Sequence, residues 1–169
     1  MSAQIPGCTD ARATNFNPAA NQNDGSCLYA VTSYSLVKLN GKLSDTINET
    51  SGLINLNGEL WTINDSGSPA NLYHFSKQTG EILQTIHIRN ATNIDWEDIA
   101  TDGSYIYIGD FGNNNGNRSS MSVYKIAISR LSSKTNDTIT ADTIRFSYAD
   151  QTDFSSRPNA NRYDCEAMM

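Results

Sequence analysis

Three carboxylates gather in one short stretch of this sequence, at Asp95, Glu97 and Asp98. Related acidic residues stand at Glu49 and again at Asp164 and Glu166. Carboxylates that converge must bind a cation, take up protons or pair with arginine, because unpaired like charges are costly to bury together. Hard oxygen ligands suit calcium or magnesium better than zinc. The sequence therefore predicts a divalent-cation site, with calcium as the candidate and these ligands: Glu49, Asp95, Glu97, Asp164 and Glu166.

A second acidic set consists of Asp65 and Asp110, each at the end of a predicted strand. Asp110 is the candidate general base if the protein is a hydrolase. The alternative for any one of these acids is a turn cap that accepts a backbone N–H. The repeated Asp-x-Glu pattern favours metal or ligand contact, since turn capping alone does not require the same two carboxylates twice.

The loop that follows offers a candidate ligand face. Asn113, Asn114 and Arg118 carry polar groups that could hydrogen-bond sugar hydroxyls, although a long inter-strand turn is the alternative. An exposed Trp96 beside the carboxylates would suit a carbohydrate face, whereas a buried Trp96 would pack between sheets. The sequence contains no Gly-x-Ser-x-Gly elbow, Walker loop or zinc motif, and the two histidines lack neighbouring ligands at metal-binding spacing.

Alternating strand patterns joined by short turns predict an all-β fold. Hairpins are expected over 34–47, 52–65, 71–88 and 99–110, and a longer one over 121–149. Asn40-Gly41, Asn57-Gly58 and Asp102-Gly103 supply two-residue turns. Residues 48–67 align with 93–112 without a gap, and 163–168 repeat the order of 94–99. Four strands per unit at such a period are typical of β-propeller blades.

The predicted architecture is a partial β-propeller of about two and a half four-stranded antiparallel blades. Its parts are the outer strands of a closing blade at 34–47, blade A at 49–88, blade B at 95–149 and the start of blade C at 164–169. Because a ring needs at least about four blades, the sequence is expected to be a fragment of a longer protein. The alternative is an open sandwich of two four-stranded sheets.

Residues 1–29 form a separate module with many polar turn formers. A disulfide between Cys8 and Cys27 would close a loop and contribute roughly 3 kcal/mol, whereas Cys165 has no evident partner on this chain. Four side chains in the module carry oxygens that could bind calcium, but their spacing differs from an EF-hand and a polar turn is the alternative: Asp10, Asn21, Asn23 and Asp24. The propeller region is predicted over 30–169.

Charge and hydropathy exclude two classes of partner. The chain has 12 basic and 18 acidic residues, a net charge of −6, and no cluster of Lys and Arg that would bind nucleic acid. No apolar run approaches the ~20 residues of a membrane span. The opening residues MSAQIPG lack the basic and apolar regions of a signal peptide.

Residues 7–29 resemble a short module of secreted and surface proteins from Bacteroidetes-type bacteria, with the pattern GCTD…A.NYNP.A..DDGSC.Y. The resemblance implies an exported protein, in agreement with the cysteine pattern. It is carried by Gly7, Cys8, Thr9, Asp10, Asn15, Asn17, Pro18, Asp24, Gly25, Ser26, Cys27 and Tyr29.

Residues 49–169 resemble a family of secreted bacterial propellers with the patterns SGL…LW..NDSG…LY, DWEDIA….YIGD.GNN.GNR and YD.EAM. The family implies a propeller fold and type IX secretion. More remotely the region is similar to gluconolactonase and phytase-like propellers, which implies a divalent cation in a central channel. The matching residues are 51–53, 60–61, 64–67, 72–73, 90–91, 95–100, 107–110, 112–114, 116–118, 124, 163–164 and 166–168.

Three functions are consistent with these patterns. The first is an extracellular or cell-surface binding or adhesion module, stabilised by calcium, whose ligand is a carbohydrate or a protein. The second is a metal-dependent hydrolase of the lactonase or phosphoesterase kind, with Glu97 and Glu166 as ligands and Asp110 as the base. The third is a purely structural surface domain. Binding is favoured over catalysis because no nucleophile or base stands out beyond the acidic residues.

Overall fold

The structure is a computed structural model that describes residues 3–38, 42–158 and 160–169. The chain divides into two compact units, Met1–Val37 and Lys38–Met169. The described residues form strands and one short 3-10 helix, η1 (Ile128–Arg130), so the predicted all-β fold is confirmed.

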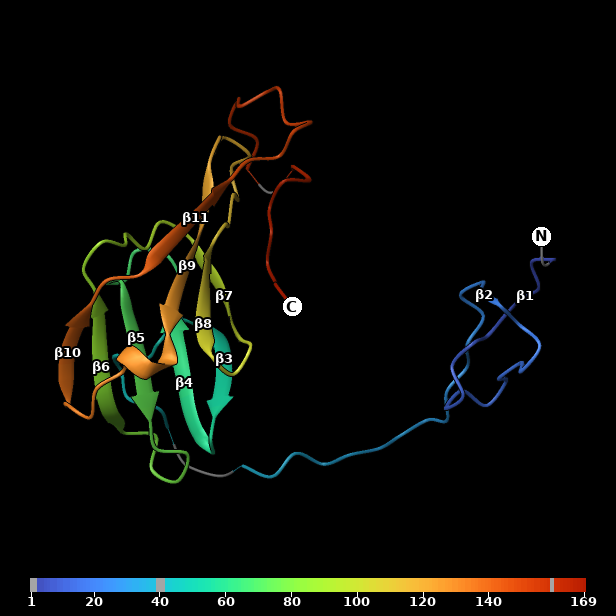
Figure 1. The fold of residues 1–169 in the computed structure, drawn as a ribbon, viewed down its shortest axis with the longest axis horizontal. Coiled ribbons are helices and arrows are strands. Elements are labelled where there is room, and N and C mark those ends of the chain that lie inside the picture. The colour runs from blue at the N-terminus through green and yellow to red at the C-terminus, as the bar shows by residue number, and fades with distance from the viewer. Residues whose placement is uncertain (1–2, 39–41, 159) are drawn as a thin grey trace. The chain divides into compact units, whose positions relative to one another are not determined.

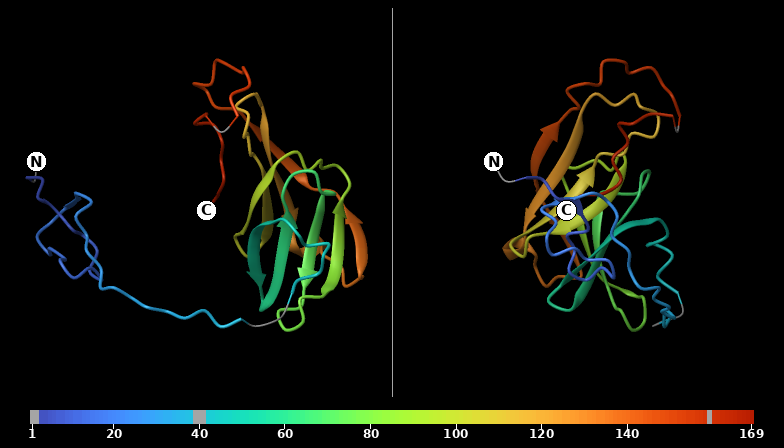
Figure 2. Two further views of the ribbon diagram at one scale, coloured as in Figure 1. Left: turned by 180° about the vertical axis from the view of Figure 1, so that it is seen from behind. Right: turned by 90° about the vertical axis from the view of Figure 1, so that its right-hand side faces the viewer.

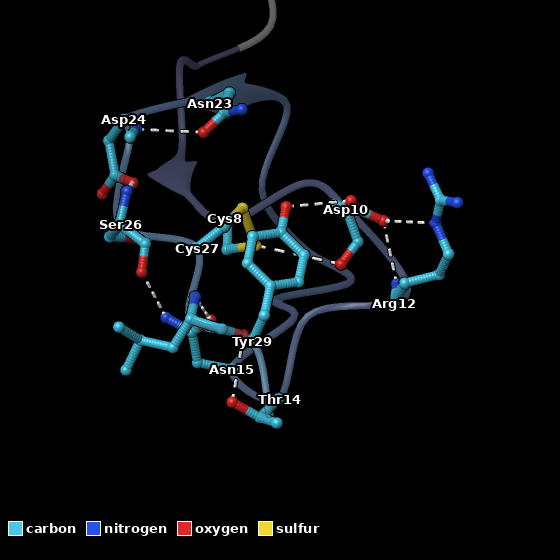
Figure 3. Close-up of a disulfide and its surroundings, with 12 residues drawn as sticks. Cys8, Asp10, Arg12, Thr14, Asn15, Asn23, Asp24, Ser26, Cys27 and Tyr29 are labelled. Atoms are coloured by element: carbon cyan, nitrogen blue, oxygen red, sulfur yellow. Dashed lines mark hydrogen bonds and ion pairs between the residues drawn. A yellow bond between two sulfur atoms is a disulfide. The ribbon is translucent and has the colours of Figure 1, made fainter. Parts of the chain in front are cut away.

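The N-terminal unit is a small loop held by the predicted disulfide between Cys8 and Cys27 (Figure 3). Strand β1 (Pro6–Gly7) pairs in parallel with β2 (Gln22–Asn23). The oxygens considered for calcium are used locally instead. Each of these side chains accepts a backbone N–H, which favours the turn alternative: Asp10 from Arg12, Asn21 from Ile5, Asn23 from Gly25 and Asp24 from Ser26.

The first sheet of the larger unit contains the four strands predicted within 49–88. They are β3 (Thr50–Leu56), β4 (Glu59–Asn64), β5 (Asn71–Phe75) and β6 (Ile82–Ile88), each antiparallel to the next (Figure 1). The turn between β3 and β4 has positive φ at both Asn57 (53°) and Gly58 (93°). This conformation explains the Asn-Gly pair, because asparagine and glycine tolerate positive φ best.

The second sheet contains the four strands predicted within 95–149. They are β7 (Trp96–Thr101), β8 (Tyr105–Asp110), β9 (Met121–Ala127) and β11 (Asp142–Phe146), in the spatial order β11-β9-β8-β7. All neighbouring pairs are antiparallel. The repeat therefore predicted both antiparallel sheets at the expected positions.

In the larger unit, one of the described strands was not predicted. Strand β10 (Asn136–Ile139) leaves the second sheet and pairs in parallel with β6, so the first sheet has the order β10-β6-β5-β4-β3. The Gln84 amide supports this crossing by donating to the carbonyl oxygens of Ser132 and Lys134. The crossing covers the edge of β6, whose ladder groups would otherwise lack strand partners.

The predicted hairpin at 34–47 is not found in the described residues. Its Asn40-Gly41 turn lies outside them, and 34–38 and 42–47 form no strand. Tyr34 and Leu36 are 80% and 89% exposed, because no described strand lies beside them. Ile47 packs instead with Tyr73 and Phe75 in a small buried cluster of the first sheet. Residues 164–169, predicted to start blade C, also form no strand.

The main core lies between the two sheets, which Figure 2 shows from two further directions. Ile63, Leu72 and Ile86 from the first sheet pack with Ile106 and Ile108 from the second, and all five are fully buried. Burial of apolar side chains from both sheets supplies the main stabilisation of the pair. The described residues form no closed ring, so the propeller stays a prediction.

Gly52 sets how closely β3 approaches β7. A Cβ atom at this position would lie 2.8 Å from the Ile99 backbone nitrogen. We therefore expect Gly52→Ala to force the strands apart and lower the free energy of unfolding by about 1–2 kcal/mol, as overpacking does elsewhere. Urea unfolding measures the change. Gly103→Ala cannot serve as the control, because Gly103 has a positive φ that would itself make alanine unfavourable. An unchanged unfolding midpoint would contradict this reading of the contact.

Candidate metal centre

Three of the predicted acidic residues lie together in the larger unit. Asp65, Asp95 and Glu97 each offer a carboxylate oxygen within 4.8 Å of the other two, and all three are partly buried. Asp65 follows the end of β4, and its N–H donates to the Glu49 carbonyl oxygen (2.8 Å). Asp95 directly precedes β7, which contains Glu97. The ends of two neighbouring sheets thus supply one group of carboxylates.

A β-bulge interrupts strand β7 at Glu97. The ladder between β7 and β8 pairs Trp96 with Asp110 and Asp98 with Gly109, so Glu97 is the extra residue. A bulge breaks strict alternation and redirects a side chain. Strand β3 has a register shift at the corresponding place, between Thr50 and Gly52. The bulge allows Trp96 and Ile99 both to face the core, while Glu97 stays on the side where Asp95 lies, two residues earlier.

The Gly112 backbone lies directly against two of these carboxylates, those of Asp95 and Glu97. A Cβ atom there would lie 2.5 Å from Oδ2 of Asp95 and closer still to Oε1 of Glu97. The Gly112 N–H also donates to the Asp95 carbonyl oxygen (3.2 Å). The space that any other side chain would occupy is therefore already taken by carboxylate oxygens.

The C-terminal segment, residues 160–169, brings two further acids near the group. Asp164 accepts the Asn113 N–H (2.5 Å), which places it beside the loop that carries Gly112. Glu166 lies near enough to Glu97 for its charge to raise the pKa of the Glu97 carboxyl. Four of the five predicted ligands thus come together with Asp65, which had been placed in the second acidic set: Asp95, Glu97, Asp164 and Glu166.

Crowding of these acids changes their protonation. Burial raises the pKa of Glu97 to about 8, and repulsion from Glu166, Asp65 and Asp95 adds to the effect. Burial likewise raises the pKa of Asp95, although the Asn114 amide opposes the rise. In the absence of a cation, Glu97 therefore keeps its proton near neutral pH.

Three of the acidic residues singled out from the sequence, Glu49, Asp98 and Asp110, lie outside this group. The Glu49 side chain is exposed and is not one of the grouped carboxylates. Asp98 accepts the Ile99 and Met168 N–H groups (both 2.8 Å), so it connects β7 to the C-terminal segment. Each of these residues has a backbone role that sequence spacing alone does not separate from a ligand role.

Asp110 forms a buried ion pair instead of facing solvent. Its Oδ1 atom lies 3.0 Å from Nη2 of Arg118 and also accepts the Asp95 N–H (3.1 Å). Only 1% of the Asp110 side chain and 14% of that of Arg118 are exposed. Burial raises the pKa of Asp110, while Arg118 opposes the rise. This geometry gives Asp110 a structural role and leaves it poorly placed to act as a general base.

Arg118 holds the loop after β8 in shape. Its guanidinium donates to the carbonyl oxygens of Asp110 (3.1 Å) and Gly112 (2.6 Å). Its N–H donates to Oδ1 of Asn113, a residue that is 1% exposed. Arg118 and Asn113, which were predicted to contact ligand, are therefore mainly parts of the loop's internal framework.

Trp96 does not belong to the ligand face. Its side chain is fully buried in the core and lies 5.9 Å from the Tyr124 ring between their centroids. The idea of an exposed Trp96 on a carbohydrate face is therefore wrong. The alternative holds, in which Trp96 packs between the sheets, because its large apolar surface is removed from water there.

A polar hollow of about 340 Å³ opens beside Asp95. Besides Asp95, its lining includes three residues that the sequence predicted to contact ligand, Asn113, Asn114 and Arg118. The other lining residues were not singled out from the sequence: Ser66, Ile94, Asn115 and Asn117. Asn114 also donates to Oδ2 of Asp95 (3.3 Å). The loop thus contributes to both the acidic group and the hollow.

Sequence reasoning missed two asparagines with matching roles. Asn93 donates to the carbonyl oxygens of Asn64 and Asp65, and its Oδ1 accepts the Trp96 N–H. Asn161 donates to the carbonyl oxygens of Asn113 and Asn114, and its Oδ1 accepts the Tyr163 N–H. Each asparagine stands shortly before an Asp-x-Glu sequence. That shared position is the sequence signal that could have found them.

The histidines behave as predicted strand residues. His74 stacks on Trp61 with 4.8 Å between ring centroids, and its Nε2 lies 2.8 Å from Glu59. His87 lies 3.1 Å from Oδ1 of Asn71. Cys165 forms no disulfide in the part of the chain that the structure describes.

Comparison of the chain with protein-family models, curated proteins and solved structures finds no match. Within 3–38, 42–158 and 160–169, no helix has the length and apolar character needed to cross a membrane.

Proposed function

We propose that residues 38–169 act as a calcium-stabilised binding module of a secreted or cell-surface protein. The observation that carries this proposal is the convergence of the Asp65, Asp95 and Glu97 carboxylates, with Asp164 and Glu166 nearby. Their charges are not balanced by Arg118, which is already paired with Asp110. A bound divalent cation would offset the mutual repulsion of these acids.

The donor chemistry fits calcium. Asp65, Asp95 and Glu97 offer oxygen atoms, and the group includes neither histidine nor cysteine. Calcium takes six to eight oxygen ligands in flexible geometry, whereas zinc prefers nitrogen and sulfur. Asp164 and Glu166 come from a separate segment, so the cation would join β4, β7 and the C-terminal residues.

The extracellular location is supported by the disulfide between Cys8 and Cys27, because structural disulfides persist in oxidising compartments. The resemblance to secreted proteins of Bacteroidetes-type bacteria agrees with that location. Together these features favour export of the protein, with the acidic group working where free calcium is abundant.

The proposed architecture is part of a β-propeller, and matched contacts at two successive units support it. Gly52 of β3 lies against the Ile99 nitrogen of β7. Asp98, which follows the β7 bulge as Gly52 follows the β3 bulge, accepts the N–H of Met168. The C-terminal segment thus approaches β7 as β7 approaches β3. The equivalent actions of Asn93 and Asn161 support the same repetition.

The hydrolase alternative receives less support. Its candidate base, Asp110, is buried and paired with Arg118. A purely structural domain remains compatible with the cation site but does not use the hollow beside it. Binding is therefore the function that the geometry supports best.

Calcium titration tests the proposal. We expect millimolar calcium to raise the melting temperature of the full chain by several degrees, since a ligand that binds only the folded state stabilises it. Asp95→Asn should remove most of this increase. Glu49→Gln is the matched control and should keep it, because the Glu49 side chain lies outside the group.

A melting temperature that calcium does not change would contradict the proposal. Equal calcium responses in Asp95→Asn and Glu49→Gln would place the cation elsewhere. Magnesium at the same concentration distinguishes a specific site from general screening of negative charge, which both cations provide.

A further inference from the structure

We infer that the hollow beside Asp95 binds a neutral carbohydrate, a ligand class that deepens the proposed binding function and rests on it. The hollow has a volume of about 340 Å³ and opens at the edge of the acidic group. Its wall combines amide, hydroxyl and carboxylate groups from Asn114, Ser66 and Asp95. These are the donors and acceptors that sugar hydroxyls pair with.

Part of this wall is free to bind a ligand. The side chains of Asn115 and Asn117 and the hydroxyl of Ser66 have no hydrogen-bond partner among the residues that the structure describes. The loop that carries them is nevertheless fixed by buried Asn113 and by Arg118. A preformed loop with unused polar groups binds at a lower entropic cost than a loop that must first become ordered.

The charge of the wall selects against acidic ligands. Asp95 lines the hollow, and the only cation among its described lining residues, Arg118, already bonds Asp110 and Gly112. Even with one divalent cation bound, the grouped carboxylates would keep a net negative charge beside the hollow, so an anionic ligand would meet repulsion that Arg118 does not offset. A neutral sugar avoids that repulsion and uses its hydroxyls to bond both amides and carboxylate.

One apolar side chain completes the wall. Ile94 lines the hollow and is 55% exposed. The C–H face of a sugar ring can pack on such a surface while its hydroxyls contact the amides. A peptide chain would require partners for its backbone groups as well as deeper apolar pockets, because most of a peptide's binding energy comes from buried side chains. A carbohydrate is therefore the better fit.

The test uses the full chain and neutral hexasaccharides of glucose, mannose, xylose and N-acetylglucosamine as probes. Hexagalacturonate and neutral Ser/Gly-rich peptides provide the acidic and peptide arms. Binding is measured by NMR titration, with and without calcium. We expect at least one neutral hexasaccharide to bind, and hexagalacturonate to bind at least tenfold more weakly.

The double variant Asn115→Ala/Asn117→Ala should weaken this binding about tenfold, as loss of two hydrogen bonds predicts. Asn136→Ala on β10 is the control, because that side chain is exposed and distant in the sheet order. Both changes should leave the calcium response intact, since neither replaces a carboxylate.

Several outcomes overturn the inference. The first is that no neutral hexasaccharide binds. The second is that the double variant binds the sugar as tightly as the parent chain, and the third is that only the peptides bind. The same samples report separately on the proposed function. A calcium response without sugar binding rejects only the carbohydrate, whereas sugar binding without a calcium response rejects only the cation site.

Discussion

Replacing Asp110 with alanine is expected to lower the free energy of unfolding by about 3–5 kcal/mol, the usual result of removing one partner from a buried ion pair. The change leaves the Arg118 guanidinium without its carboxylate and the Asp95 N–H without its acceptor. Both groups lie next to the loop that carries Gly112. Urea unfolding in calcium-free buffer measures the effect without a contribution from cation binding.

Asp142→Ala is the matched control, since Asp142 is an exposed aspartate on β11 of the same sheet. It should change the stability by no more than about 0.5 kcal/mol. If Asp110→Ala were as harmless as Asp142→Ala, Asp110 would have to be a solvated group, and its role as a general base would become the better explanation.

The second large effect is a loss of stability as the pH rises in calcium-free buffer. The pKa of Glu97 increases from 4.5 to about 8 on folding, so the folded chain holds this proton more tightly than the unfolded chain does. The associated stability is fully present below pH 4.5 and is lost as the pH rises through 8. Asp95 changes in the same direction.

The complete shift corresponds to about 4–5 kcal/mol at about 1.4 kcal/mol per pH unit. Because Glu97 is only partly buried, solvent screening should reduce the measured loss to about 2 kcal/mol between pH 5.5 and 8.5. Calcium should remove most of this pH dependence by taking the place of the proton. The measurement is chemical unfolding at both pH values with and without calcium.

Glu97→Gln isolates the group responsible. Glutamine stays neutral, so the calcium-free variant should be more stable than the parent chain at pH 8.5 and should lose the pH dependence together with the calcium response. Glu49→Gln should retain both. A parent chain whose stability does not fall between pH 5.5 and 8.5 would show that Glu97 is not crowded by its neighbours.

Local patterns predicted much of the fold. The alternation of apolar residues and the Asn57-Gly58 turn were sufficient to place β3 and β4, because neighbouring strands in a hairpin are specified by local sequence. The same reasoning placed β7 and β8. Strand β10 was missed because its partner, β6, lies far away in the sequence. Propensity describes a strand but does not choose its neighbour.

The candidate site was predicted in composition but not in detail. The repeated Asp-x-Glu pattern identified Asp95, Glu97 and Glu166, because carboxylates that lie close together repel one another unless a cation or a proton offsets their charge. It could not separate Asp65 from Asp110, which occupy matching positions in the sequence. The difference is Arg118, which pairs with Asp110 and leaves Asp65 to join the other acids.

The crossing of β10 to the first sheet makes the two sheets depend on each other during folding. Strand β10, which lies between β9 and β11 in the sequence, pairs with the edge of β6. The first sheet therefore cannot gain its fifth strand before β9 of the second sheet has been synthesised. Separation of the sheets would strip β10 from β6 or pull β11 from β9. Residues 38–169 are therefore expected to unfold in a single transition, with both sheets becoming accessible to proteases at the same denaturant concentration.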